Sequence, residues 1–258
     1  MASSSAPLAR LVRLLADSQR MLIFTGAGIS TASGIPDYRG PKGVWQTRAP
    51  VFYDDFLRSE EARREYWQQK LEDRTEWGAA TPNEVHHAIV ALEQAGRVEM
   101  VVTQNIDGLH RAAGTSPERL VEVHGTVGEV ECQACGRRTA PQPHFDAFAA
   151  TGEPPRCDCG GFLKPATISF GQSLRQDDLR LAFSAAERAD LVLALGSTLS
   201  VTPAANIPLY AAERDTPYVI INRGPTDHDR LHEVTLRVEG DVGEVLVPAV
   251  AEVLASPA

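Results

Sequence analysis

The chain has 258 residues, a length that fits one large domain or a domain that carries inserts. Its 43% hydrophobic and 23% charged residues are typical of globular proteins and exclude a disordered or fibrous chain. A net charge of −9 argues against nucleic acid as a partner but leaves a basic peptide possible. The longest apolar run, at residues 191–195, is far too short to cross a bilayer, so we expect no membrane partner.

The first expected element is an amphipathic helix. Leucines recur at helical spacing from Leu8 to Leu15. Two arginines in this stretch and the serines at 3–5 would also fit a transit peptide. Asp17 and the direct continuation into a strand favour an ordinary first helix. Because no secretory signal is visible, we interpret the chain as intracellular and cytoplasmic.

Short apolar runs alternate with helical stretches along the rest of the chain. Each run ends in glycine or polar residues, as buried strands of a parallel sheet do. The expected strands are residues 21–25, 98–103, 191–195 and 218–221, and the expected helices are 82–95, 175–186 and 204–214. This alternation predicts an α/β fold with a Rossmann-like, doubly wound parallel sheet. In such sheets the ligand crevice lies at the carboxyl ends of the strands.

Two stretches interrupt the alternation. Residues 41–80 are rich in charged and aromatic residues, and we expect a helical module there. Residues 129–164 contain all four cysteines and several prolines, and we expect a second small module. The sequence therefore predicts a single domain over residues 1–258 with two inserted modules.

The four cysteines form two close pairs, Cys132 with Cys135 and Cys157 with Cys159. Four thiolates grouped in this way predict one closed, tetrahedral, structural zinc site. A redox pair or two disulfides are the alternatives. Clustering of every cysteine of an intracellular chain within 28 positions favours zinc.

A glycine-rich turn follows the first expected strand. Gly26 and Gly28 would let the backbone approach a pyrophosphate, beside the positive N-terminus of the next helix. The third glycine of the dehydrogenase fingerprint is replaced by Thr31, and no acidic residue closes a second strand about 20 residues later. The sequence therefore predicts a dinucleotide site that is not an ordinary hydride-transfer site.

Short motifs follow one another over residues 20–245: 26–30, 34–40, 103–110, 124–125, the four cysteines, 170–171, 196–199 and 221–222. In this order they resemble the sirtuins, the Sir2-type NAD-dependent protein lysine deacylases. The resemblance implies a Rossmann-like large domain with a helical module and a zinc-ribbon module. It also implies NAD as a consumed co-substrate, one structural Zn and acyl-lysine peptides as partners. The products would be nicotinamide, O-acyl-ADP-ribose and free lysine.

The resemblance assigns three catalytic residues. His124 matches the general base that activates a ribose hydroxyl, a role that suits the pKa range of histidine. Asn105 would hold the ribose or a water, and Asp107 the nicotinamide carboxamide. The alternatives are a structural histidine and a simple Asn/Asp turn. His110 is expected to be structural.

The resemblance also assigns contacts to NAD and to the acyl-lysine peptide. The cofactor contacts would be Gly26, Ala27, Gly28, Ser30, Asp37, Tyr38, Arg39, Trp45, Gln104, Asn105, Asp107, Gly196, Ser197, Thr198, Asn222, Arg223, Gly224, Asp241 and Val242. The substrate contacts would be Tyr38, Ile106, Ile168, Phe170, Gly171, Leu199 and Val201. Gln172 departs from the acidic residue usual after Phe-Gly, which puts any peptide preference based on that charge in question.

The subgroup is addressed by residues of the expected helical module. One branch of the family reads succinyl and malonyl groups with a tyrosine and an arginine three residues apart. Here Tyr66 is followed by Gln69, so we expect dicarboxylic acyl groups to be disfavoured. Motifs of two other branches are mixed in this chain, which indicates a bacterial member outside the well-studied subgroups.

Two other functions remain open at this point. One is a sirtuin-fold ADP-ribosyltransferase or NADase with weak deacylation, and the other is a non-catalytic NAD-sensing module. The complete set of His124, Asn105 and Asp107 favours a deacetylase. The oligomeric state and the native substrate cannot be predicted from the sequence.

Overall fold

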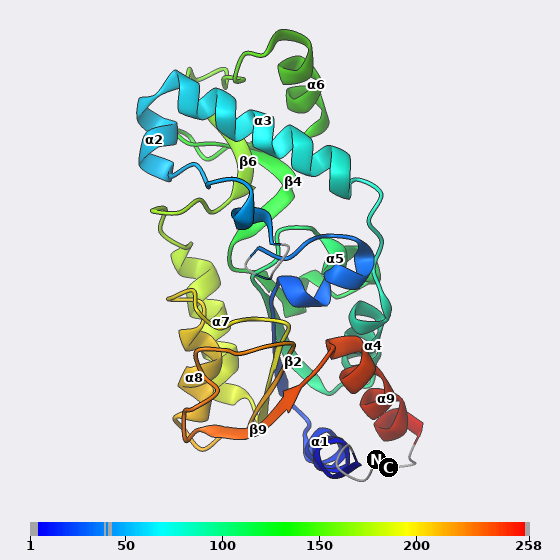
Figure 1. Ribbon diagram of the computed structural model, residues 1–258. Coiled ribbons are helices and arrows are strands. Elements are labelled where there is room, and N and C mark those ends of the chain that lie inside the picture. The colour runs from blue at the N-terminus through cyan, green and yellow to red at the C-terminus, as the bar shows by residue number, and fades with distance from the viewer. Residues whose placement is uncertain (1–4, 39, 41–42, 256–258) are drawn as a thin grey trace.

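A parallel six-stranded sheet organises the molecule (Figure 1). The computed structural model describes residues 5–38, 40 and 43–255. The sheet has the order β3-β2-β1-β7-β8-β9, and every neighbouring pair is parallel. The strands are β1 (Met21–Thr25), β2 (Val98–Thr103), β3 (Leu120–Glu122), β7 (Leu191–Leu195), β8 (Tyr218–Asn222) and β9 (Val234–Glu239). Since β1 lies between β2 and β7, the chain winds outward from β1 in both directions.

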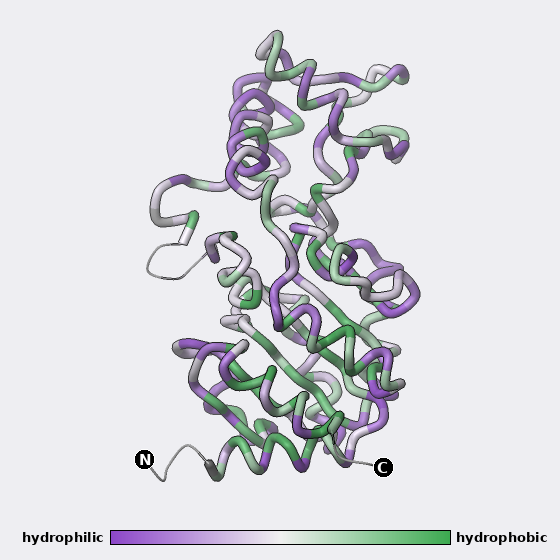
Figure 2. The backbone as a smooth tube through the Cα atoms, turned by 90° about the vertical axis from the view of Figure 1, so that its right-hand side faces the viewer, coloured by the Kyte–Doolittle hydropathy of each residue, from purple (hydrophilic) through white to green (hydrophobic). Residues whose placement is uncertain are grey.

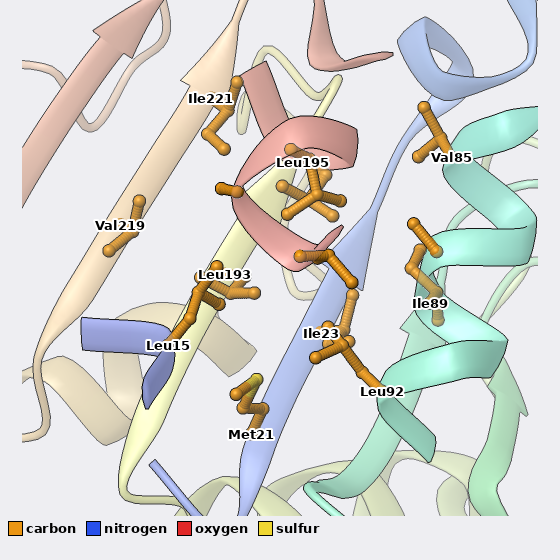
Figure 3. Packing of buried hydrophobic residues seen from close by; sticks show 14 of the residues in the cluster. Leu15, Met21, Ile23, Val85, Ile89, Leu92, Leu193, Leu195, Val219 and Ile221 are labelled. Carbon is orange, nitrogen blue, oxygen red and sulfur yellow. The ribbon is translucent and has the colours of Figure 1, made fainter. Parts of the chain in front are cut away.

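Helices cover both faces of this sheet. On one face, α1 (Ser5–Asp17), α4 (Glu84–Gln94) and α9 (Val242–Ala255) bury leucine, isoleucine and valine against β1, β7 and β8. Figure 3 shows Ile89 and Leu92 of α4 facing Ile23 of β1 within this core. The other face is covered by α7 (Gln176–Arg188) and α8 (Asn206–Ala212). This arrangement confirms the doubly wound α/β fold.

A second, smaller core lies at the end of the molecule away from the two termini (Figure 1). It combines α2 (Tyr53–Arg58) and α3 (Glu60–Trp77) with an antiparallel sheet of order β5-β4-β6 and with α6 (Gln142–Thr151). The strands are β4 (Gly125–Cys132), β5 (Arg138–Thr139) and β6 (Leu163–Thr167). Trp67 of α3 is fully buried here, and its Nε1 donates to the carbonyl of Leu163 at 3.0 Å. Segments about 96 positions apart in sequence therefore share one apolar cluster.

The tube view repeats this division (Figure 2). Apolar colour gathers in the strands of the large sheet, whereas α3, at the other end of the molecule, is mainly hydrophilic in colour. The remaining helical segments are α5 (Leu109–Ala113) and the short 3-10 turns Ala27–Ile29, Thr31–Ser33, Val44–Gln46 and Pro117–Arg119. In the described part of the chain, no helix is long and apolar enough to cross a membrane.

Helix boundaries follow local capping chemistry. The Asn83 side chain accepts a hydrogen bond from the backbone amide of Val85, and the Asn83 backbone amide donates to His86 Nδ1. The helix α4 therefore begins at Glu84 rather than at the expected residue 82. Ser59 caps α3 through the amide of Ala62. The helix α8 is shorter than the expected 204–214, since it starts only after the turn that contains Pro203.

Candidate active site

The sheet has a topological switch point between β1 and β7, where a crevice is expected at the carboxyl ends of the strands. A cavity of about 1050 Å³ opens there and continues toward α3. Its wall includes Gly26 after β1, Gln104 after β2, Gly196 after β7, Asn222 at the end of β8 and Gly240 after β9. The ends of distant sequence segments thus meet in one cavity.

Three glycines allow the first turn to pack directly on the turn after β7. A Cβ on Gly26 would lie 2.7 Å from the carbonyl oxygen of Gly196, and one on Gly28 would lie 2.8 Å from the Gly196 Cα. Gly196 itself has a φ of 60°, and a Cβ there would lie 2.6 Å from the amide nitrogen of Ile29. The Gly28 amide donates to the Gly196 carbonyl at 2.8 Å. The two turns therefore approach mainly through their backbones, with the Ser197 Cβ also next to Gly26.

Asn105 and Asp107 lie in the loop after β2, where internal hydrogen bonds hold them. The Asn105 side-chain amide donates to the Gly26 carbonyl at 3.1 Å and to Ser30 Oγ at 3.2 Å. Ser30 Oγ in turn donates to Asp107 Oδ2 at 2.8 Å. Burial raises the pKa of the Asp107 carboxyl, against the opposing hydrogen bonds from Leu109 and Ser30. The Asn105–Ser30–Asp107 group thus joins the loop to the glycine turn.

His124 lies immediately before β4, on the cavity wall. Its Nδ1 is 3.1 Å from the carbonyl oxygen of Gln104. Because a carbonyl oxygen only accepts, Nδ1 carries the hydrogen, and Nε2 is the basic nitrogen of the neutral ring. The amide of Ile168 donates to the His124 carbonyl at 2.8 Å. The histidine is therefore oriented as a proton acceptor at Nε2.

The cavity wall also carries neutral donors and one ion pair. Gln104 Nε2 donates to Ser197 Oγ at 2.8 Å. The Asn222 side chain is buried and donates to the carbonyl of Gly224 at 3.1 Å. Arg223 pairs with Asp241 Oδ2 at 2.9 Å. Donors and acceptors of this kind suit a ribose and the polar edges of a nucleotide.

Aromatic rings form the cavity wall nearest α2. Tyr38 and Trp45 have ring centroids 5.2 Å apart, and Trp45 and Phe170 are 5.1 Å apart. Phe52 continues the row at 5.9 Å from Phe170, and the Tyr53 amide donates to the Phe170 carbonyl at 2.9 Å. The segment that carries Phe170 is thus fastened to the start of α2.

Most of the residues assigned from the sequence line this one cavity. The exceptions are Ser30, Asp107 and Leu199, which do not line it: the first two bond to each other and Leu199 is buried. Arg39 lies outside the described residues, so its position is not assigned. The remaining cavity-lining predictions are Gly26, Ala27, Gly28, Asp37, Tyr38, Trp45, Gln104, Asn105, Ile106, His124, Ile168, Phe170, Gly171, Gly196, Ser197, Thr198, Val201, Asn222, Arg223, Gly224, Asp241 and Val242.

The sequence analysis missed a charged group at the α3 end of the cavity. Arg48, Lys70 and Asp73 all line it. Lys70 Nζ donates to Asp73 Oδ2 at 3.0 Å, and Arg48 forms an ion pair with the other oxygen of Asp73. Spacing on α3 places Lys70 and Asp73 on one face, but nothing in the sequence indicates that Arg48 meets them.

The four cysteine sulfurs lie within 4.8 Å of one another. Cys132 and Cys159 Sγ are 3.5 Å apart, and Cys135 and Cys157 Sγ are 3.8 Å apart. Zn–S bonds of about 2.3 Å in a tetrahedron put sulfurs about 3.8 Å apart, so the residues fit a zinc ion. The described residues form no disulfide between these cysteines.

Two buried histidines contact each other behind the Asn105 loop. His86 and His110 have ring centroids 5.0 Å apart, and His110 Nε2 bonds with Thr25 Oγ1 at 3.0 Å. Burial lowers the pKa of His86 to about 4 and that of His110 to about 3. Both rings are therefore neutral in the folded chain, and His110 has the structural position expected from the sequence.

The buried His86–His110 pair predicts that the protein becomes less stable at low pH. The unfolded state binds protons on these histidines below about pH 6.5 and the folded state does not, so stability falls as the pH drops from 6.5 toward 4. At pH 5 each histidine is expected to cost about 2 kcal/mol of unfolding free energy. Urea unfolding at pH 7.5 and 5.0 measures the loss. A His110→Gln protein, which keeps a polar partner for Thr25, should lose less on acidification; an equal loss would contradict this origin.

Comparison with known proteins agrees with this geometry. The family model described as Sir2 family matches residues 26–203. An "NAD-dependent protein deacetylase" of Rhodopseudomonas palustris is 39% identical over 96% of this chain and 98% of its own length. A protein of the same description from Haloarcula marismortui is 41% identical over 92% of this chain and 91% of its own.

Solved structures give the same result. One described as "Structural Basis for the Mechanism and Regulation of Sir2 Enzymes" has a TM-score of 0.85 at 36% identity and covers 96% of this chain and 98% of its own. Another, "Sir2-p53 peptide-NAD+", has a TM-score of 0.82 at 34% identity, with 96% and 99% covered. Fold, cavity and sequence agree, and the resemblance seen in the motifs is confirmed: the chain belongs to the Sir2 family, the sirtuins.

Proposed function

We propose that this protein is an NAD-dependent protein lysine deacetylase that converts acyl-lysine and NAD to free lysine, nicotinamide and O-acyl-ADP-ribose. The observation that carries the proposal is the meeting of His124, Asn105 and the glycine turn in one cavity at the switch point of the sheet. The relatives described as NAD-dependent protein deacetylases support it over nearly the whole chain.

The cavity residues fit NAD. Backbone of the touching glycine turns offers close approach to a pyrophosphate, and Ser197 and Asn222 offer neutral polar groups for the adenosine half. When bound, NAD supplies a ribose carbon that loses nicotinamide and a ribose hydroxyl that receives the acyl group. The protein contributes binding, orientation and proton transfer.

His124 takes the proton of the ribose hydroxyl at Nε2. The bond from Nδ1 to the Gln104 carbonyl fixes the ring orientation and stabilises the ring when it becomes charged. We assign Asn105 to the ribose side of the cavity, since it lines the wall beside Gly26. We assign Asp107 to the nicotinamide end of the cavity. It does not line the cavity itself, and it accepts a hydrogen bond from Ser30 next to the wall.

Apolar and aromatic side chains enclose the acyl-lysine stem. Tyr38, Ile106, Ile168 and Phe170 line the part of the cavity next to His124. The substrate backbone lies between the segment at Phe170–Gly171 and the segment at Leu199–Val201, as an added strand. Such a site excludes water from the reacting atoms.

We also propose the module limits and the compartment. Residues 41–80 form the helical module and residues 129–164 the zinc module, on the support of their shared apolar cluster. The cytoplasm is the proposed location, because reduced cysteines that bind zinc suit a reducing compartment.

The proposal is tested by incubating the protein with an acetyl-lysine peptide, with and without NAD. We expect the deacetylated peptide with its free lysine side chain, nicotinamide and O-acetyl-ADP-ribose in equal amounts, and no reaction without NAD. Mass spectrometry measures all three. Deacetylation that proceeds equally well without NAD would overturn the proposal, and ADP-ribose release that needs no acyl-lysine would favour an NADase.

A further inference from the structure

A polar network supports the cavity wall at the ends of β8 and β9. Residues 223–233 form neither helix nor strand, although the first of them line the cavity. Arg237, on the edge strand β9, has 20% of its side chain exposed and does not line the cavity itself. Its Nη1 donates to the Asn222 carbonyl at 3.1 Å and its Nη2 to the Gly224 carbonyl at 2.5 Å. Arg237 thus joins β9 to the wall after β8.

The Gly224 carbonyl connects Arg237 to the side chain of Asn222. Asn222 Nδ2 donates to this carbonyl at 3.1 Å and to the Arg223 carbonyl at 3.3 Å. Because carbonyl oxygens only accept, the side-chain nitrogen faces them and Oδ1 lies on the other side of the amide group. In the described part of the chain no donor bonds to Asn222 Oδ1, and Asn222 lines the cavity. Oδ1 is therefore an acceptor that a ligand hydroxyl can use.

Asp229 fixes the other side of the Arg237 guanidinium. Its Oδ1 accepts from Arg237 Nε at 2.7 Å and from Thr226 Oγ1 at 2.6 Å, and its Oδ2 accepts from the Thr226 amide at 3.0 Å. The arginine and the carboxylate together carry no net charge, so this pair does not act by attracting phosphate. A guanidinium holds its N–H groups in a rigid planar fork. One position of Arg237 therefore sets the carbonyls of both Asn222 and Gly224.

We propose that Arg237 is a positioning residue for the cofactor. It holds the Gly224 carbonyl where the Asn222 amide bonds to it, and so keeps Asn222 Oδ1 available to a ribose hydroxyl of the adenosine half. The inference rests on the proposed deacylase function and adds a residue outside the cavity that decides affinity for NAD. Since Arg237 bonds to no residue of the acyl-lysine end, it acts on the cofactor and not on the peptide.

Calorimetry with ADP-ribose measures this affinity without turnover. In Arg237→Met the Kd should rise about tenfold, the effect of one hydrogen bond. The same titration uses ADP-ribose whose adenosine lacks either the 2′- or the 3′-hydroxyl. For at least one of these ligands the two proteins should bind equally, because the hydroxyl that Asn222 accepts is gone. Arg237→Lys keeps the charge beside Asp229; it should show a smaller rise and carries the test if Arg237→Met does not fold.

Steady-state kinetics gives a second readout. In Arg237→Met the KM for NAD should rise by the same factor as the Kd for ADP-ribose. The kcat at saturating NAD and the KM for the acyl-lysine peptide should stay unchanged. A general weakening of the fold would instead lower kcat or raise both KM values.

Arg97→Met is the matched control. Arg97 also donates to three carbonyls, those of Leu15, Ala16 and Ser18, but it does not line the cavity. This variant should lose stability in urea and keep the wild-type Kd.

Three results would refute the inference and leave the deacylase function standing. The first is wild-type affinity in the Arg237 variants, the second an equal loss for all three ligands, and the third an equal loss in Arg97→Met. If the wild type neither binds ADP-ribose nor releases nicotinamide from NAD, the proposed function fails and the inference with it.

Discussion

Replacement of His124 by tyrosine is expected to lower deacylation by about 10²–10⁴-fold while NAD still binds. In the proposed mechanism the base acts on a ribose hydroxyl after nicotinamide has left, so it is not needed to hold the dinucleotide. The glycine turns, Ser197 and Asn222 remain in place in the variant, because none of them bonds to the His124 side chain. Exchange of labelled nicotinamide, which needs only the first step, should survive better than peptide deacylation.

The comparison with Asn105→Ala sharpens this test. In the proposed mechanism Asn105 acts at the ribose before bond cleavage, and it also joins the loop to Gly26, so its loss should impair exchange and deacylation together. His232→Tyr, at a side chain that is 93% exposed, is the matched control and should behave as wild type. If His124→Tyr deacylates at nearly the wild-type rate, or fails to bind NAD at all, the role of the residue has been misassigned.

Removal of one zinc ligand is expected to have the largest effect on stability. Cys132 and Cys157 are both part of the smaller apolar core, together with Tyr66 and Trp67. Structural zinc contributes apparent binding free energies of about 10–16 kcal/mol in small zinc modules. A whole domain is stable by only about 5–15 kcal/mol. Cys157→Ser should therefore lose the metal and unfold this core.

Elemental analysis should give one zinc per chain in the wild type and less in Cys157→Ser. Limited proteolysis should then cut within residues 129–164, while the large sheet stays protected. Ala134→Ser, at an exposed position between two of the cysteines, should keep both metal and protection. A Cys157→Ser protein with its full zinc content and an intact module would show that the cysteines do not hold the metal.

The parts of the fold that could be predicted are those with strong local signals. The central strands are continuous apolar runs, because helices cover both of their faces, and every residue of β7 is buried. The edge strand β9 was missed because it is no apolar run: its residues alternate between apolar and polar, and only one of the six is buried. β3 has only three residues, too few for a pattern. Both segments form strands because of the neighbours that they pair with in the folded sheet.

The residues of the candidate site likewise fall into those that could be predicted from the sequence and those that could not. Gly26, Asn105, Gly196 and Asn222 could be predicted because each lies at or just after the carboxyl end of a strand, and parallel strands end at one edge. The group of Arg48, Lys70 and Asp73 could not be predicted, since it forms only where the Val44–Val51 segment meets α3. The spacing along α3 alone therefore could not reveal the ion pair between Arg48 and Asp73.

The backbone contact between the turns after β1 and β7 has a genetic consequence. When a larger side chain clashes with a neighbouring side chain, a second mutation can usually restore space by shortening that neighbour. Gly26, Gly28 and Gly196 leave no such option, because each faces main-chain atoms of the others and no residue is smaller than glycine. Compensation would require both strands to separate, which their ladder of hydrogen bonds opposes. A side chain at any of these three positions therefore cannot be accommodated by a second substitution at the contact. Sequence changes in related chains are expected at other positions.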